Sequence, residues 1–206
     1  MTVARRITRS RRPLSVEQYL GGPPDEKKTE LIRGERVVAP SPSDRHQDVQ
    51  VDLGHILRAW VGKQGLGWVW PDLDMVLDEK EGLVYRQDLL FLAREHADRR
   101  RQGRVFGPAD LCGEILSPSD RPRLLRQKYT DYACFGVNWY WILNPDEKEP
   151  VIEENERVGE QDQVRSETVG DGWFQPAAFP GLQICIARLI GGDWKAAVKA
   201  KGKKFL

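Results

Sequence analysis

The sequence predicts one domain of the α/β class with α+β character, built on a mixed sheet with two main helices. Residues 84–93 and 110–116 are apolar and of strand length, as is typical of buried strands. Apolar residues recur at helical spacing within residues 45–64, and short β-prone segments follow residue 139. Strands mixed with helices in this order favour a layered mixed domain, and 206 residues suffice for one.

The N-terminal third should contain a short helix, a hairpin and the best helix of the chain. Ser15 is a suitable cap for a helix to Leu20, which Gly21 and the residues after it would end. Two β-prone stretches around Arg33-Gly34 predict a hairpin. The long helix should end at Gly65 and bury one face, formed by Val49, Leu53, Ile56, Leu57 and Trp60.

The middle of the chain should supply strands. Residues 68–70 and LDMVL (73–77) are expected to be strands separated by Pro71-Asp72. The strand signal is strongest in residues 84–93 and 110–116, and an arginine-rich piece, residues 94–104, lies between them. A loop at this place is well positioned to contact a phosphate backbone, although arginine-rich loops are more often simply solvated.

The last third predicts one more helix and several strands. The helix should run from about residue 121 to 135, with Gly136 beyond its end. WYWIL (139–143) is expected to be a central strand buried on both faces. The segments after it indicate a run of antiparallel strands.

The two ends of the chain are basic, although the whole chain is nearly neutral. The chain has 32 Lys and Arg against 31 Asp and Glu, which argues against a protein coated with positive charge. Residues 1–12 are expected to be a mobile basic tail, residues 13–190 a single domain, and residues 191–206 a basic C-terminal tail. No segment is apolar enough to span a bilayer, and the N-terminus lacks the apolar core of a secretory signal.

The three cysteines, Cys112, Cys134 and Cys185, are expected to be reduced thiols in the cytoplasm. Their odd number and the absence of a CxxC pair argue against a disulfide framework and a zinc site.

Two carboxylates interrupt the two strongest strands. Asp88 and Glu114 each lie within an otherwise apolar segment, and burying a carboxylate there is costly unless a partner compensates. Two such residues on successive strands suggest a shared hard cation such as Mg²⁺, with the carbonyl of Ile115 as a further ligand. Glu30 could join this site from the N-terminal hairpin.

Phosphodiester hydrolysis also requires a positively charged group near the reacting phosphate. The strand position that would share a face with Glu114 is Leu116, so this strand cannot supply it. Lys128 on the following helix could point toward Glu114, and Arg121, Arg123 and Arg126 on the same stretch suit phosphate contacts. His46 at the start of the long helix is more simply a local hydrogen-bonding residue, with a supporting role near the site as the alternative.

These segments carry a resemblance to a known family. RQDLLFLA, GEILSPSD, the helix with QKYTDYACFGV, and NWYWILNPDE resemble the Uma-two family of restriction endonucleases, a branch of the PD-(D/E)XK nuclease superfamily. TELIRGE and SPSDRHQ match its N-terminal half, so the resemblance covers about residues 14–190. It implies a restriction-endonuclease-like core, a mixed sheet flanked by helices, with extra antiparallel strands near both ends.

The resemblance also implies roles. Asp88 and Glu114 would be metal ligands, with Ile115 as the expected backbone ligand, Lys128 the catalytic lysine relocated to a helix, and Glu30 an accessory acidic residue. The resemblance further implies DNA cleavage with Mg²⁺ (or Mn²⁺) and a homodimer. The chain departs from the family pattern at Gln87, at Leu124 and at Cys112-Gly113.

Three functions remain open from the sequence. The first is a metal-dependent DNA endonuclease. The second is a catalytically inactive nuclease fold that binds nucleic acid or a protein partner. The third, ranked last, is a glycosidase in which Asp88 and Glu114 flank a sugar bond, since it leaves Lys128 without a role.

Overall fold

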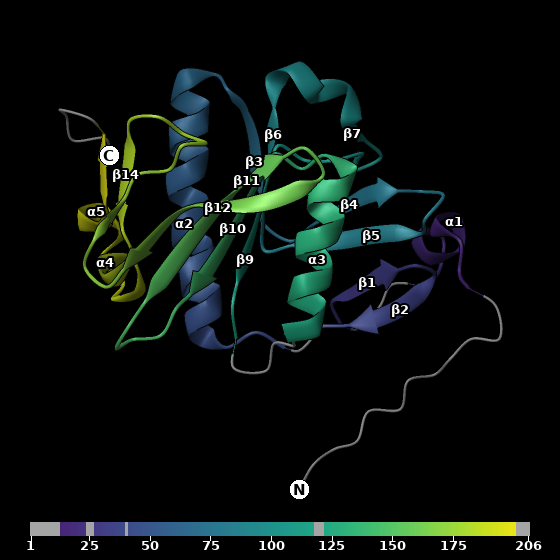
Figure 1. Ribbon diagram of the computed structural model, residues 1–206, viewed down its shortest axis with the longest axis horizontal. Helices are drawn as coiled ribbons and strands as arrows, with labels where there is room; N and C mark the ends of the chain where they lie inside the picture. Colours follow the sequence, from purple (N-terminus) through teal and green to yellow (C-terminus); the bar gives the residue numbers. More distant parts are fainter. Residues whose placement is uncertain (1–12, 24–26, 40, 118–121, 201–206) are drawn as a thin grey trace, which may run out of the picture.

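The computed structural model describes residues 13–23, 27–39, 41–117 and 122–200, which form three sheets and several helices (Figure 1). The first sheet has the order β2-β1-β5-β4-β8-β7 and the second β12-β11-β10-β9-β6-β3. Each contains one parallel pair, β4 with β8 and β9 with β10, so both are mixed. The third, β13-β14-β15, is small and antiparallel. The predicted mixed fold with antiparallel additions near both ends is confirmed.

The elements have the following bounds. The first sheet is formed by β1 (Thr29–Ile32), β2 (Glu35–Val38), β4 (Leu73–Asp78), β5 (Leu83–Gln87), β7 (Arg100–Arg101) and β8 (Arg104–Phe106). The second is formed by β3 (Gly67–Trp70), β6 (Leu89–Ala93), β9 (Leu111–Ile115), β10 (Trp139–Asn144), β11 (Val151–Val158) and β12 (Gln161–Val169). The third is formed by β13 (Trp173–Phe174), β14 (Leu182–Cys185) and β15 (Val198–Ala200). The helices are α1 (Val16–Leu20), α2 (Asp44–Gln64), α3 (Pro122–Phe135), α4 (Ile186–Ile190), α5 (Trp194–Ala197) and the 3₁₀ helix η1 (Arg94–Arg99).

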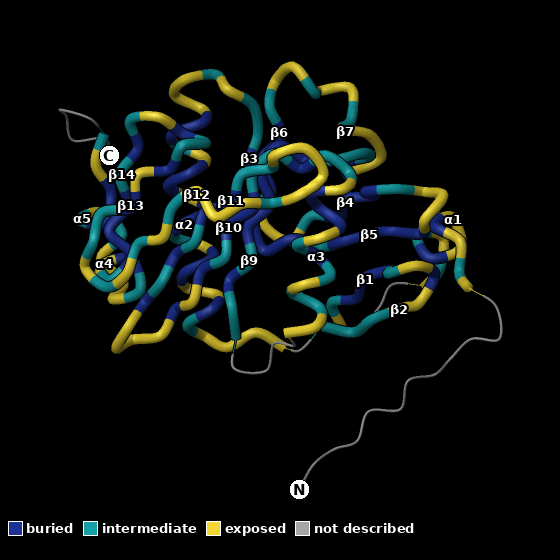
Figure 2. Tube along the Cα trace, viewed as in Figure 1, coloured by how far each residue is buried: buried dark blue, intermediate teal, exposed yellow. Residues whose placement is uncertain are grey.

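Alternation along β9 separates two hydrophobic cores. Leu111 and Ile115 belong to the core that includes the buried face of α2, whereas Cys112 belongs to the core that includes Tyr132 of α3 and Tyr85 of β5. Glu114 shares the face of Cys112 and therefore points toward α3 and the first sheet. Trp141 and Leu143 of β10 belong to the first core and Tyr140 to the second, so β10 is buried on both faces as predicted. In Figure 2, β5 is also drawn largely in the dark blue of buried residues.

The ends of the long helix follow the sequence signals. The Ser43 hydroxyl accepts a hydrogen bond from the backbone N–H of His46, which caps the start of α2. Gly65 ends the helix in the left-handed conformation, with φ of 65°. These two signals fix where His46 lies relative to the sheets.

The predicted strand over residues 84–93 is wrong in one respect, because the structure divides it into two strands. β5 belongs to the first sheet and β6 to the second, and Asp88 lies between them. The side-chain amide of Gln50 donates to the Asp88 carbonyl at 2.9 Å, which replaces a ladder hydrogen bond at this break. Asp88 therefore lies at the joint of two sheets and not in the middle of one strand.

Regular structure extends beyond residue 190, the predicted C-terminal end of the domain. Within the expected tail of residues 191–206, α5 packs near α4, and β15 pairs with β14 through residue 200. Ala197 and Val198 bury apolar surface in the core beside α2, which is why this stretch folds. The expected N-terminal tail, residues 1–12, and Arg121 lie outside the described residues. Among the described helices, none has the length and apolar character required to cross a membrane.

Candidate active site

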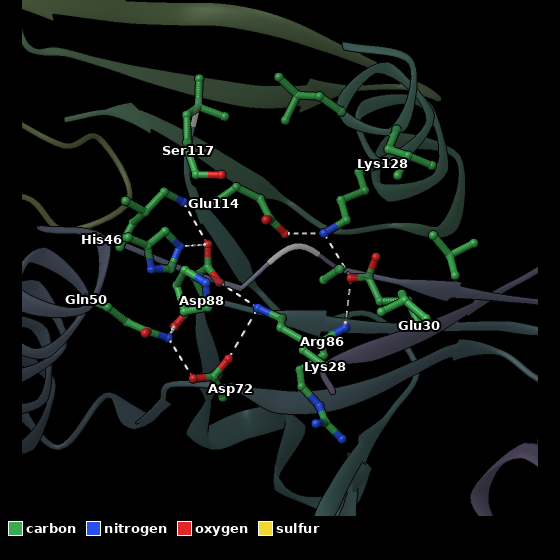
Figure 3. Close-up of a pocket in the computed structure, with 18 of the residues that line it drawn as sticks. Lys28, Glu30, His46, Gln50, Asp72, Arg86, Asp88, Glu114, Ser117 and Lys128 are labelled. Carbon is green, nitrogen blue, oxygen red and sulfur yellow. Dashed lines mark hydrogen bonds and ion pairs between the residues drawn. The ribbon is translucent and has the colours of Figure 1, made fainter. Parts of the chain in front are cut away.

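A cavity of about 280 Å³ lies where the two large sheets, α2 and α3 meet. Its wall includes four carboxylates and two lysines, which come from five different parts of the chain (Figure 3). These residues are Lys28, Glu30, Asp72, Asp88, Glu114 and Lys128. The sequence-predicted residues Asp88, Glu114, Ile115, Lys128 and Glu30 thus line a single cavity.

Lys128 connects two of the carboxylates. Its Nζ lies 2.7 Å from Glu114 Oε1 and 2.9 Å from Glu30 Oε1, and all three side chains are at most 12% exposed. Burial alone would lower the pKa of Lys128, but the charges of Glu114 and Glu30 raise it above its ordinary value. The amine therefore stays protonated at neutral pH.

The buried charge of Glu114 is less well stabilised by its neighbours than the charge of Lys128. Burial raises the pKa of Glu114 to about 7, and the negative charge of Asp88 adds to this effect while Lys128 opposes it. Glu30 also receives a hydrogen bond from the backbone N–H of Arg86 at 3.2 Å, which holds its carboxylate beside Lys128. The cavity wall thus contains four carboxylates, two lysines and Arg86.

Asp88 is held by donors from three other parts of the chain. Its Oδ2 lies 2.9 Å from the backbone nitrogen of Ile115 and 3.1 Å from His46 Nε2, while its Oδ1 lies 2.6 Å from Lys28 Nζ. Burial alone would raise the pKa of Asp88, but the hydrogen bond with His46 and the charge of Lys28 lower it below its ordinary value. Asp88 is thus ionised and fixed in orientation.

Lys28, Asp72 and Gln50 line the cavity next to Asp88, and the sequence analysis did not assign them to the site. Lys28 also lies 3.2 Å from Asp72 Oδ1, and Gln50 Nε2 donates to Asp72 Oδ2 at 3.0 Å. Two spacing signals were available in the sequence. Lys28 precedes Glu30 by two residues, just before β1, so in extended backbone the two side chains point to the same side. Gln50 lies one turn after His46 on α2.

The position of Lys128 depends on a buried network next to it on α3. Asp131 is 1% exposed and accepts hydrogen bonds from Arg33 at 2.6 and 3.1 Å, from Tyr85 Oη at 2.5 Å and from Gln127 at 3.1 Å. Arg33 belongs to the β1–β2 turn, where it adopts a positive φ of 49°. This network therefore joins α3 to the hairpin that carries Glu30.

The residues of the cavity fit a hard divalent cation. No group of three or more histidine, cysteine, aspartate and glutamate side chains is arranged as a metal site in the part of the chain that the structure describes. Mg²⁺ does not need such a cage, because it commonly takes one or two carboxylates and keeps several waters. Asp88 and Glu114 supply two carboxylates to one cavity. Burial and, to a smaller extent, the charge of Asp88 raise the pKa of Glu114, and a bound cation would favour its ionised form.

Comparison with known proteins identifies the family of the chain. The Uma2 family model, described as "Putative restriction endonuclease", matches residues 16–188. The chain belongs to the Uma2 family. Among the solved structures, this Uma2 chain is similar to one titled "Crystal structure of a putative nuclease belonging to DUF820 from Anabaena variabilis", with 18% identity and a TM-score of 0.70. That match covers 87% of this chain and 99% of the other, and at this identity it shows the fold. No curated protein matches.

The structure shows the surroundings of three positions at which the sequence departs from the pattern that the resemblance implies. The side chain of Gln87 is fully buried and its Oε1 accepts a hydrogen bond from Tyr132 Oη at 2.7 Å, which ties β5 to α3. A Cβ at Gly113 would lie 3.2 Å from the Leu89 Cβ, so glycine allows β9 to approach β6 closely. Leu124 lines the cavity without adding charge.

Proposed function

We propose that this chain is a metal-dependent endonuclease that hydrolyses phosphodiester bonds in DNA, with Mg²⁺ or Mn²⁺ as cofactor. The observation that supports this most is the contact of Lys128 with both Glu114 and Glu30 in the cavity that also contains Asp88. Membership of a family described as a restriction endonuclease supports the same reaction class.

Asp88 and Glu114, with the Ile115 carbonyl, are the proposed metal ligands. A bound Mg²⁺ would supply Lewis-acid stabilisation of the charge that develops on the phosphate. Lys128 remains protonated because its pKa is raised, so it cannot take a proton from water. We assign it to orienting the attacking water and to stabilising phosphate charge by hydrogen bonding, with Glu30 holding its amine in place.

Exposed arginines are the proposed contacts for the DNA backbone. Arg123 and Arg126 are exposed on α3, the helix that carries Lys128, and Arg100 and Arg101 are exposed on β7. Guanidinium groups bind phosphate well because they offer several donors in a fixed geometry. Such contacts position a duplex without reading its sequence, so binding should weaken as salt concentration rises.

The test is cleavage of supercoiled plasmid DNA with Mg²⁺ or Mn²⁺ by the parent, Glu114→Gln, Lys128→Ala and Asp88→Asn. Each variant should lose at least about a hundredfold in rate, as is typical when a catalytic proton-handling or charge-stabilising group is removed. Glu35→Gln is the matched control, because Glu35 is exposed on β2 outside the cavity. It should cut as fast as the parent.

The same experiment separates the alternative functions. Cleavage by Lys128→Ala and Glu114→Gln at the parent rate would show that the assigned site is wrong. Salt-dependent DNA binding by the parent without cleavage in either metal would indicate a nucleic-acid binding module instead.

Assembly and location extend this proposal. We propose a homodimer, as expected for the family, and light scattering after size-exclusion chromatography measures it. We also propose a cytoplasmic location, where Cys112, Cys134 and Cys185, all free in the structure, would stay reduced.

A further inference from the structure

Lys28 contacts two carboxylates of different character. Asp88 Oδ1 at 2.6 Å belongs to a side chain that is 4% exposed, whereas Asp72 Oδ1 at 3.2 Å belongs to one that is 49% exposed. Burial alone would lower the pKa of Lys28, but the charge of Asp88 raises it, so the ammonium is charged. One cation thus lies between an inner and an outer acceptor (Figure 3).

Lys28 occupies the oxygen of Asp88 that a metal would need. Oδ2 is held by His46 and by the backbone N–H of Ile115, both fixed by the fold, whereas Oδ1 is held by the flexible side chain of Lys28. A divalent cation beside Oδ1 would strongly repel an ammonium group that close to the same oxygen. Binding at Asp88 therefore requires the Lys28 amine to move away.

Asp72 is already placed to receive that amine. Its backbone has a positive φ of 47°, which an aspartate tolerates better than most residues, and Asp72 lines the cavity from the loop after β3. Gln50 Nε2 bonds to Asp72 Oδ2 and to the Asp88 carbonyl, so it fixes the outer acceptor relative to the inner one. Asp72 Oδ1 is the oxygen that faces Lys28.

We propose that Lys28 is an internal counter-ion of Asp88 that a divalent cation displaces onto Asp72. Lys28 and Asp72 then set the metal affinity of the site without being ligands themselves. This inference rests on the proposed function for the identity of the ion.

The test is isothermal titration calorimetry with Mn²⁺ and no DNA, on the parent, Lys28→Met, Asp72→Asn and the double variant. Lys28→Met should bind Mn²⁺ about tenfold more tightly, since the ion no longer competes with a charged hydrogen bond. Asp72→Asn should bind about threefold to tenfold more weakly, because the displaced ammonium loses its acceptor. In the Lys28→Met background, Asp72→Asn should have almost no effect.

Matched variants separate this mechanism from simple charge effects. Lys27→Met removes the same charge from the exposed neighbouring residue and should leave the affinity unchanged. An effect of Asp72→Asn that persists in the Lys28→Met background would mean that Asp72 acts by its charge alone, and it would overturn the displacement. Equal Mn²⁺ affinity of the parent and Lys28→Met would overturn it as well.

The failure of the proposed function has a different signature. Glu114→Gln should abolish Mn²⁺ binding in both the parent and Lys28→Met backgrounds, which assigns the measured heat to this cavity. Absence of Mn²⁺ binding in the parent and in Lys28→Met alike would overturn the metal site itself. Lys28→Gln removes the same charge with a side chain that can still donate a hydrogen bond, so it replaces Lys28→Met in all these comparisons if Lys28→Met does not fold.

Discussion

Replacing Lys128 by methionine should destabilise the folded chain strongly in the absence of metal. The change removes a cation that lies 2.7 Å from Glu114 and 2.9 Å from Glu30 in a site where each side chain is at most 12% exposed. Removing one partner of a buried ion pair typically costs about 3–5 kcal/mol, because the remaining charge stays buried and uncompensated. We expect the free energy of unfolding at pH 8 to fall by this amount.

The cost should be smaller at pH 6. Burial already raises the pKa of Glu114 to about 7, and loss of the Lys128 charge removes a contribution that lowers it. A carboxyl whose pKa is raised in the folded state takes up a proton as the pH falls, and the protonated form is tolerated in the interior. The penalty of Lys128→Met should therefore decrease from pH 8 to pH 6.

Urea unfolding in EDTA at the two pH values measures both effects. Arg123→Met on the same helix is the matched control, since Arg123 is exposed and its replacement should change the free energy of unfolding by no more than about 0.5 kcal/mol. Lys128→Met combined with Glu114→Gln should recover part of the loss. A penalty below about 1 kcal/mol at pH 8, or one that is equal at the two pH values, would refute the reasoning.

Two further changes test regions outside the cavity. Burial raises the pKa of Asp162 to about 6, so its protonated form stabilises the fold below about pH 4 and this contribution is lost as the pH rises to 6. Because Asp162 is partly exposed, the expected effect is small: Asp162→Asn should raise the free energy of unfolding by about 1 kcal/mol at pH 7 and should not change it at pH 4. Urea titrations at the two pH values measure this, and an equal gain at both would contradict it. Arg33→Lys should lower the free energy of unfolding by about 1–2 kcal/mol, because lysine cannot reproduce the two hydrogen bonds from Arg33 to buried Asp131. A thermal unfolding midpoint equal to that of the parent would contradict this prediction.

Local signals in the sequence were sufficient for the elements with clear boundaries. The long helix follows from apolar spacing and from Gly65, and the β1–β2 hairpin follows from Arg33-Gly34. The face of the sheet to which Glu114 points also follows from strand alternation. The residue two positions later on that face is Leu116, so a lysine near Glu114 had to come from the next helix. The placement of Lys128 beside Glu114 is therefore a consequence of short-range rules together with one packing contact.

The same signals did not predict that one expected strand divides into two strands that belong to different sheets. Residues 84–93 are apolar except at Arg86, Gln87 and Asp88, and nothing in this pattern marks which neighbours each half pairs with. β5 pairs with β1 and β4, whereas β6 pairs with β3 and β9, so the break depends on long-range contacts. Lys28 and Asp72 were missed for the same reason, because they become neighbours of Asp88 only through this arrangement.

The position of Asp88 at this joint explains how the chain tolerates a buried carboxylate. Within a continuous strand its backbone would be committed to the ladder, and its side chain would face a packed apolar layer. At the joint its carbonyl bonds to Gln50, and its carboxylate reaches the end of β9, the start of α2 and Lys28 at once. Desolvation of the charge is thus offset by donors from separate elements, which come together only when both sheets are formed. The acidic site and the junction between the sheets should therefore form in the same folding step, and a variant that loosens this junction should lose the geometry of Asp88 before it loses either sheet.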